Sequence, residues 1–161
     1  MKRLLLMRHA KSSWKETEVP DIERPLKKRG AKDAEKMGKL LRNKKMVPDL
    51  IISSTAERAV KTAEIVAHAS KYEHEIIFSE SLYMAEPSAI LKAVKEHGKK
   101  KKTVMVIGHN PGLEAFLQIL TGKVESLPTA SIAYLAAKLD NWDDLGDEKE
   151  VKLKNLWIPK D

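Results

Sequence analysis

Residues 4–14 read LLLMRHAKSSW and give the clearest local pattern in the chain. Their short apolar run predicts a buried strand, and Arg8 and His9 follow it directly. The strand therefore delivers a cation and an imidazole to its carboxyl end. In open α/β sheets, ligands bind at the carboxyl ends of the strands. An isolated Arg-His pair is more often a surface cap, so the interpretation depends on what the rest of the chain places beside it.

Length and composition bound the class of protein. A chain of 161 residues without cysteine suits one domain, residues 1–161, and excludes disulfides, thiolate zinc sites and cysteine nucleophiles. The apolar run before Arg8 is too short for the core of a signal peptide, and no apolar stretch approaches the roughly 18 residues of a membrane span. We therefore expect a cytoplasmic protein that does not bind membranes.

The net charge of +7 favours acidic partners. Much of the positive excess lies in helix-like or loop-like segments such as 27–32 and 99–102, where a solvated face is the common explanation. Aromatic residues make up 5% of the chain and do not interleave with the basic ones, as a platform for single-stranded nucleic acid requires. We therefore expect no nucleic-acid partner.

Strand and helix patterns alternate along the chain, which is typical of an α/β fold in which helices cover a largely parallel sheet. Residues 80–84 and the acidic segment 140–150 are predicted as loops. Helices are predicted at 26–42, from a start near 54 to 69, at 87–98 and at 113–120, and further strands at 49–53, 75–78, 103–107, 131–139 and 151–157.

Two helix starts carry local signals. Ser54 with Glu57 three residues later matches a capping box, which places Arg58 in the first helical turn. Asn110 is a preferred N-cap and Pro111 a preferred first helical residue. Because a helix N-terminus attracts anions, its free N–H groups are expected to face the end of the preceding strand.

Three predicted strand ends carry chemically active residues. Arg8 and His9 follow the first strand, Arg58 lies in the helix after the second, and His109 follows the strand at 103–107. Parallel strands end at the same edge of a sheet, so two guanidinium groups and two imidazoles are expected to share one pocket. Arginine binds phosphate oxygens through a planar, bidentate fork, and histidine acts as nucleophile or proton carrier. This composition suits a phosphoryl group.

Four motifs surround these residues: LMRHAKSSW at 6–14, RPLKKRG at 24–30, SSTAERA at 53–59 followed by TAE at 62–64, and GHNPG at 108–112. In this order, over roughly residues 2–137, the chain resembles the histidine phosphatase superfamily (RHG family), and within it the SixA-type phosphohistidine phosphatases. Any one motif is weak evidence, but four in order are strong. The superfamily usually carries Arg-His-Gly in the first motif, whereas this chain has Ala10, a departure that itself resembles the SixA branch.

The resemblance implies a phosphoglycerate-mutase-like fold, a three-layer α/β/α sandwich around a mostly parallel (mixed) sheet. It also implies a phosphoenzyme mechanism in which His9 is the nucleophile and Arg8, Arg58 and His109 hold the phosphoryl oxygens. No cofactor is implied. No metal is expected either, because the sequence has neither a GxxxxGK[ST] loop nor a close cluster of histidines and carboxylates.

The proton-donating acid is the least defined part of this interpretation. Many members of the superfamily have a carboxylate near the middle of the chain, and Glu80 is the nearest match, with Glu86 a weaker one. A solvated loop glutamate is the competing interpretation of Glu80, and the sequence leaves both open.

The proposed roles also predict properties of His9. A nucleophilic imidazole must be neutral, and two nearby arginines lower its pKa because they disfavour the protonated ring. The ring nitrogen that does not attack needs a hydrogen-bond acceptor, for which a backbone carbonyl is the expected partner.

Three functions fit these patterns. The leading one is a metal-independent phosphatase that acts on phosphohistidine in a protein such as a histidine-containing phosphotransfer domain. The motifs are joined by short connections that leave little chain for a lid, and an imidazole leaving group needs less help from an acid than an alkoxide does. The alternatives are a phosphatase or mutase of small phosphorylated metabolites and a non-catalytic binder of phosphate or polyanions.

Overall fold

The computed structural model describes residues 1–14, 19–147 and 150–160. Its strands and helices follow the predicted order, and their bounds lie within one or two residues of the predicted ones except for the second helix, which begins at Glu57, about three residues after the predicted start near 54. The segments predicted as loops at 80–84 and 140–150 each contain a 3₁₀ turn in their described residues, η2 (Glu80–Leu82) and η3 (Trp142–Asp144), and another, η1 (Asp21–Glu23), follows the first strand. Residues 148 and 149 of the second predicted loop lie outside the described residues. The main elements are β1 (Lys2–Arg8), α1 (Lys28–Asn43), β2 (Leu50–Ser54), α2 (Glu57–Ser70), β3 (Ile76–Ser79), α3 (Pro87–Gly98), β4 (Thr103–Gly108), α4 (Gly112–Thr121), β5 (Ile132–Ala137) and β6 (Val151–Trp157).

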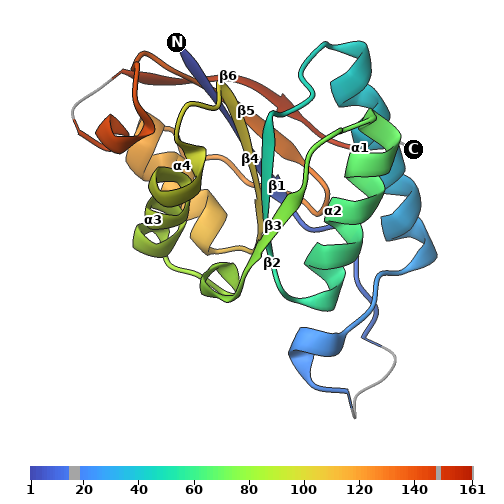
Figure 1. Ribbon diagram of the computed structural model, residues 1–161. Helices are drawn as coiled ribbons and strands as arrows, with labels where there is room; N and C mark the ends of the chain where they lie inside the picture. The colour runs from blue at the N-terminus through green and yellow to red at the C-terminus, as the bar shows by residue number, and fades with distance from the viewer. Residues whose placement is uncertain (15–18, 148–149, 161) are drawn as a thin grey trace.

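The described strands form one sheet in the order β3-β2-β4-β1-β5-β6. The strands β1 to β4 run parallel to their neighbours in this set, whereas β5 is antiparallel to β1 and β6 is antiparallel to β5. Helices α1 and α2 cover one face of the sheet and α3 and α4 cover the other (Figure 1). The predicted three-layer sandwich around a mostly parallel, mixed sheet is confirmed.

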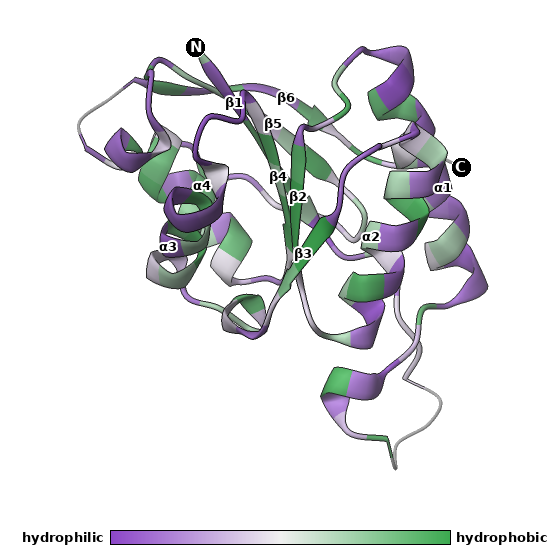
Figure 2. Cartoon of the chain, in the orientation of Figure 1, coloured by the Kyte–Doolittle hydropathy of each residue, from purple (hydrophilic) through white to green (hydrophobic). Residues whose placement is uncertain are grey.

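The alternation of side chains along β1 builds both halves of the core. Leu4 and Leu6 pack in the cluster beneath α3 and α4, while Leu5 and Met7 pack in the cluster beneath α1 and α2. All four side chains are fully buried, and burying one such side chain stabilises the fold by about 1.5–3 kcal/mol. Figure 2 shows the hydrophobic residues concentrated in the central strands. The apolar run therefore holds the end of β1 in a fixed place.

The capping box predicted at Ser54 is wrong. Ser54 is still the last residue of β2, α2 begins at Glu57, and the N-cap is Ala56 without a side-chain cap. The Ser54 hydroxyl accepts a hydrogen bond from the Ala56 N–H at 3.2 Å instead of from Glu57. Arg58 nevertheless lies in the first turn of α2, as predicted.

The predicted N-cap at Asn110 is also wrong. Helix α4 begins at Gly112 with Pro111 as its N-cap, and the Asn110 side chain donates to the carbonyl oxygen of Leu127 at 2.9 Å. The Leu113 N–H donates to the carbonyl oxygen of His109 at 3.0 Å. This N–H is therefore not free to bind an anion.

The segment that follows β1 is tied to the start of α1 by its backbone. Ser12 and Leu26 form an isolated antiparallel bridge, and the Lys27 N–H donates to the Lys11 carbonyl at 2.9 Å. Gly30 packs against that carbonyl so closely that an added Cβ would lie 2.2 Å from its oxygen. The RPLKKRG motif therefore fixes the loop that borders the end of β1.

No helix within the described residues is both long enough and apolar enough to cross a membrane.

Candidate functional site

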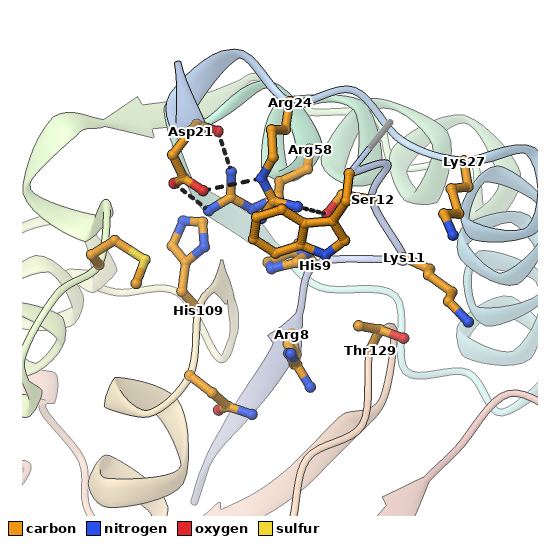
Figure 3. Close-up of a pocket in the computed structure, with 13 residues that line it drawn as sticks. Arg8, His9, Lys11, Ser12, Asp21, Arg24, Lys27, Arg58, His109 and Thr129 are labelled. Carbon is orange, nitrogen blue, oxygen red and sulfur yellow. Dashed lines mark hydrogen bonds and ion pairs between the residues drawn. The ribbon is translucent and has the colours of Figure 1, made fainter. Parts of the chain in front are cut away.

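A cavity of about 360 Å³ opens at the carboxyl ends of β1, β2 and β4 (Figure 3). Its lining includes Arg8, His9, Arg58 and His109, so the structure brings the four sequence-predicted residues together. They come together because β1 and β4 are parallel neighbours whose last paired residues are Arg8 and Gly108. The Arg58 side chain reaches the same edge from the first turn of α2, which follows the parallel strand β2.

One ring nitrogen of His9 is held by the backbone. The Nδ1 atom lies 2.8 Å from the carbonyl oxygen of Ala10, so Nδ1 carries the proton and donates it to that carbonyl, as predicted. The lone pair of Nε2 is then available. The backbone N–H of His9 donates to the carbonyl oxygen of Gly108 at 3.1 Å, and the residue is only 7% exposed. This geometry presents a positioned, uncharged nitrogen to the cavity.

Burial keeps both imidazoles uncharged. The pKa of His9 is lowered to about 4, chiefly by burial, and the nearby charges of Arg58 and Arg8 contribute to this lowering against the opposing hydrogen bond to Ala10. The pKa of His109 falls to about 3 through burial first, with His9 and Arg58 adding to the effect. The predicted direction is confirmed for His9, but burial rather than the arginines is the main cause.

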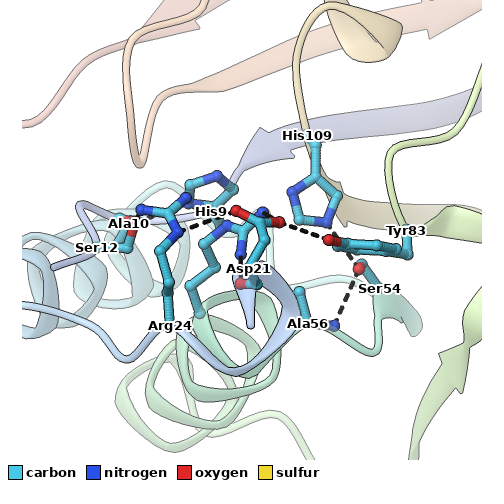
Figure 4. Close-up of polar contacts among 10 residues, drawn as sticks. His9, Ala10, Ser12, Asp21, Arg24, Ser54, Ala56, Tyr83 and His109 are labelled. Atoms are coloured by element: carbon cyan, nitrogen blue, oxygen red, sulfur yellow. Dashed lines mark hydrogen bonds and ion pairs between the residues drawn. The ribbon is translucent and has the colours of Figure 1, made fainter. Parts of the chain in front are cut away.

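His109 is oriented by β2. Its Nε2 lies 2.7 Å from the Ser54 hydroxyl, which also accepts the Ala56 N–H (Figure 4). The ring centroid of His109 lies 5.1 Å from that of His9 and 5.5 Å from that of Tyr83, which meets it edge-on. When the Ser54 hydroxyl donates to Nε2, the opposite nitrogen of His109, Nδ1, carries a proton. That nitrogen is buried and has no partner in the described part of the chain.

The two arginines are anchored by part of each guanidinium group. Arg58 donates from Nη1 to the backbone oxygen of Asp21 at 2.7 Å and from Nη2 to its carboxylate at 3.0 Å. Arg8 donates from Nη1 to the Leu127 carbonyl at 3.1 Å. The Nε atoms of Arg8 and Arg58 are buried without a hydrogen-bond partner among the described residues, like Nδ1 of His109. Leaving such a donor unpaired costs about 1–3 kcal/mol, more for a charged group, so this arrangement favours a bound anion.

Asp21 is the main site residue that the sequence analysis missed. Its carboxylate accepts hydrogen bonds from Arg24, Arg58 and the Tyr83 hydroxyl (Figure 4). The Tyr83 hydrogen bond and the arginine partners lower the pKa of Asp21 to about 2 against a smaller opposing effect of burial. The carboxylate is thus ionised at neutral pH. The three-residue spacing from Asp21 to Arg24 is the only local signal for this contact, and it is weak.

Arg24 and Trp14 also line the cavity, and Arg24 joins them to Asp21. Arg24 donates to the Ser12 hydroxyl at 2.9 Å, and its guanidinium carbon lies 3.4 Å from the centroid of the Trp14 ring. Trp14 is 68% exposed and lines the cavity mouth. These contacts extend the site beyond the strand ends.

Neither predicted candidate acid lines the cavity. Glu80 is exposed in η2, where its backbone carbonyl accepts the Tyr83 N–H at 3.0 Å, and Glu86 is exposed at the N-cap of α3. From this segment, Tyr83 is the residue that contacts Asp21. Over residues 1–14, 19–147 and 150–160, no group of three or more histidine, aspartate and glutamate side chains is arranged to hold a metal ion.

The family model of the histidine phosphatase superfamily (branch 1) matches residues 4–83. An uncharacterized chloroplastic protein of Arabidopsis thaliana is 32% identical over an alignment that covers 98% of this chain and 78% of that protein. Among solved structures, SixA of Agrobacterium tumefaciens, a proposed phosphohistidine phosphatase, is 27% identical with a TM-score of 0.84, and the alignment covers 98% of each chain. The protein histidine phosphatase SixA in complex with tungstate shares the fold, with a TM-score of 0.82 and 20% identity over 98% of this chain and 97% of that one.

Proposed function

This chain belongs to the histidine phosphatase superfamily, and we propose that it is a metal-independent phosphatase that works through a phosphohistidine intermediate on His9. The observation that carries the proposal is the uncharged Nε2 of His9 in a cavity that Arg8, Arg58 and His109 also line, where Nε of each arginine and, when Ser54 donates to Nε2 of His109, its Nδ1 are buried donors without a partner among the described residues. A nucleophile and a set of anion ligands are thus present in one cavity. These are the two parts that phosphoryl transfer requires.

In the first step, the Nε2 lone pair of His9 attacks the phosphorus of the substrate. The bond from Nε2 to phosphorus forms as the bond from phosphorus to the leaving group breaks, and the leaving group takes that electron pair and a proton from solvent. Charge spreads over the three remaining oxygens in the transition state. Arg8, Arg58 and Nδ1 of His109 donate to these oxygens without having to reorganise, which stabilises the transition state.

In the second step, water attacks the phosphorus of phospho-His9. A phosphorus–oxygen bond forms, the bond to Nε2 breaks, and inorganic phosphate leaves as the water proton passes to solvent. His9 returns to its neutral form because its pKa of about 4 lies well below neutral pH. The Ala10 carbonyl keeps the same nitrogen protonated throughout the cycle.

Among the residues that the structure describes, no protonated carboxyl group lines the cavity, and this supports a phosphohistidine substrate. Asp21 is the carboxylate that lines the described cavity, and with a pKa of about 2 it is ionised and cannot donate a proton at neutral pH. An alkoxide leaving group needs a proton from a general acid, whereas an imidazole leaving group departs more readily without one. We therefore propose phosphohistidine on a protein, such as a histidine-containing phosphotransfer domain, as the preferred substrate, and we keep a cytoplasmic location as a prediction.

The test compares kcat/KM for a phosphohistidine protein with kcat/KM for sugar phosphates and phosphoserine peptides, in the presence of a chelator and at several salt concentrations. We expect turnover with the chelator present, a preference for the phosphohistidine protein, and association that weakens as ionic strength rises. A clear preference for a small phosphomonoester would favour the alternative, a phosphatase or mutase of small metabolites. Binding of phosphate with no turnover of any substrate would favour a non-catalytic phosphate binder.

A further inference from the structure

The cavity continues beyond the residues that the proposed reaction uses. Lys11, Lys27 and Thr129 also line it, and Figure 3 places them on the side of α1, opposite Asp21 and His109. Cavities of roughly 300–1,000 Å³ hold whole small molecules or side chains, and this one is about 360 Å³. A phosphoryl group at His9 would therefore fill one end of the cavity and leave room at the other.

The two lysines are held next to each other by their backbones. The Lys27 N–H donates to the Lys11 carbonyl at 2.9 Å, and the bridge between Ser12 and Leu26 continues this pairing. Gly30 closes against the same carbonyl. Two ammonium groups are therefore attached to one small, fixed piece of backbone at the cavity wall.

No counterion for these ammonium groups is found among the residues that the structure describes. Neither Lys11 nor Lys27 has a side-chain hydrogen bond or ion pair there, whereas Asp21, the lining carboxylate, is engaged by Arg24, Arg58 and Tyr83. Like charges that share a cavity wall repel each other, and an anion between them removes that repulsion.

We propose that Lys11 and Lys27 form a second anion site, which binds a carboxylate or phosphate group carried by the substrate beside the phosphoryl group that His9 attacks. This inference rests on the proposed function and adds a selectivity that the four strand-end residues do not supply. The second anion comes either from an acidic side chain next to the phosphohistidine of a protein or from a second charged group on a small molecule.

The double variant Lys11→Gln/Lys27→Gln tests the site against a control of equal charge change, Lys28→Gln/Lys32→Gln. Lys28 and Lys32 are exposed on α1 and do not line the cavity. A general loss of positive charge changes substrate binding in both variants alike. Loss of the second anion site changes substrate binding only in Lys11→Gln/Lys27→Gln.

The first arm of the experiment uses two phosphohistidine peptides that differ by a Glu or a Gln next to the phosphohistidine. In the wild type and the control we expect the KM of the Glu peptide to be about fivefold lower than that of the Gln peptide. This factor corresponds to the upper end of the interaction free energies of exposed ion pairs. In Lys11→Gln/Lys27→Gln the two KM values become equal, with kcat retained. The second arm measures binding of phosphoglycolate and ethyl phosphate by calorimetry, since these two ligands differ by a carboxylate and need no turnover.

Discrimination in the peptide arm assigns the second anion to a protein side chain, and discrimination only in the calorimetric arm assigns it to a small molecule. Equal behaviour of the lysine variant and its control in both arms overturns the inference. Turnover through phospho-His9 without any preference for a second anion overturns the inference and leaves the proposed function intact. A wild type that forms no phosphoenzyme contradicts the proposed function, while the calorimetric arm still decides the anion site.

Discussion

The two ends of the cavity are built differently. At the phosphoryl end, His9, Arg58 and His109 are at most 7% exposed and come from strand ends or a first helical turn. At the outer end, Lys11 and Trp14 are exposed and come from the segment that connects β1 to α1. The first set is held by the sheet and the second by a loop.

This difference separates chemistry from recognition. A nucleophile and its anion ligands must be preorganised, and strand ends packed in a core hold them in place. Residues that select among substrates tolerate more freedom, and loops supply them on a rigid scaffold. Substitutions at the phosphoryl end should therefore reduce kcat, whereas substitutions at the outer end should change KM and the choice of substrate.

The largest effect expected is that of His9→Ala. Removing the nucleophile should abolish turnover, while the unfolding free energy changes by about 1 kcal/mol or less, because the ring borders the cavity and its described hydrogen bond is to the adjacent Ala10 carbonyl. Steady-state turnover and urea denaturation measure the two quantities. Normal activity in His9→Ala would show that the phosphoryl end does not act through this histidine.

Arg58→Lys should have the next largest effect. Lysine keeps the charge but loses the planar fork that anchors to Asp21 and also carries the unpaired Nε donor. We expect kcat/KM to fall by about 10²- to 10³-fold, the usual result of deleting one transition-state donor. Arg29→Lys, on the exposed face of α1, is the matched control. Activity of Arg58→Lys within twofold of wild type would contradict the role of Arg58 as a transition-state donor.

Asp21→Asn should have a smaller and more specific effect. The asparagine oxygen still accepts one hydrogen bond from Arg58, but the carboxylate that orders Arg24 and Arg58 is lost. We expect kcat to fall about tenfold because Arg58 is less well positioned, a part of the roughly 10²-fold cost of losing one donor outright. KM should not rise, because a negative charge beside the anion site has been removed. The control is Glu23→Gln in η1, which is exposed and does not line the cavity. A raised KM with unchanged kcat would place Asp21 in substrate binding instead.

The smallest effect expected is that of acid on the nucleophile. At pH 5, one unit above the pKa of about 4, only about a tenth of His9 carries a second proton. The ring of a histidine with the ordinary pKa of about 6.5 is almost fully protonated there. An NMR titration of the imidazole protons of the ligand-free protein should show His9 and His109 still uncharged at pH 5. A midpoint near 6.5 for His9 would mean that burial does not control its charge.

The same contrast explains how far the sequence could predict the molecule. Arg8, His9, Arg58 and His109 were predictable because apolar runs mark where the buried strands end, and parallel strands end at one edge. Asp21 was not, because it lies in a connecting segment with no periodic pattern, and its partner Arg58 is distant in sequence.

The incorrect details have a common cause. Ser54 and Asn110 have the residue types of helix caps, but their side chains instead bind His109 and Leu127 across the fold. Glu80 was predicted as the proton-donating acid from its place along the chain, but its side chain is exposed to solvent. Tertiary contacts override local preference in the first two cases, and position along the chain carries no geometry in the third.

The most direct test of the central claim is to trap the phosphoenzyme. Wild-type protein incubated briefly with a phosphohistidine substrate and then denatured should carry one phosphoryl group, labile in acid and stable in alkali as expected for a phosphoramidate. Peptide mapping should locate that group on His9, and His9→Ala treated in the same way should remain unlabelled. A phosphoryl group on another residue, or equal labelling of His9→Ala, would contradict the account.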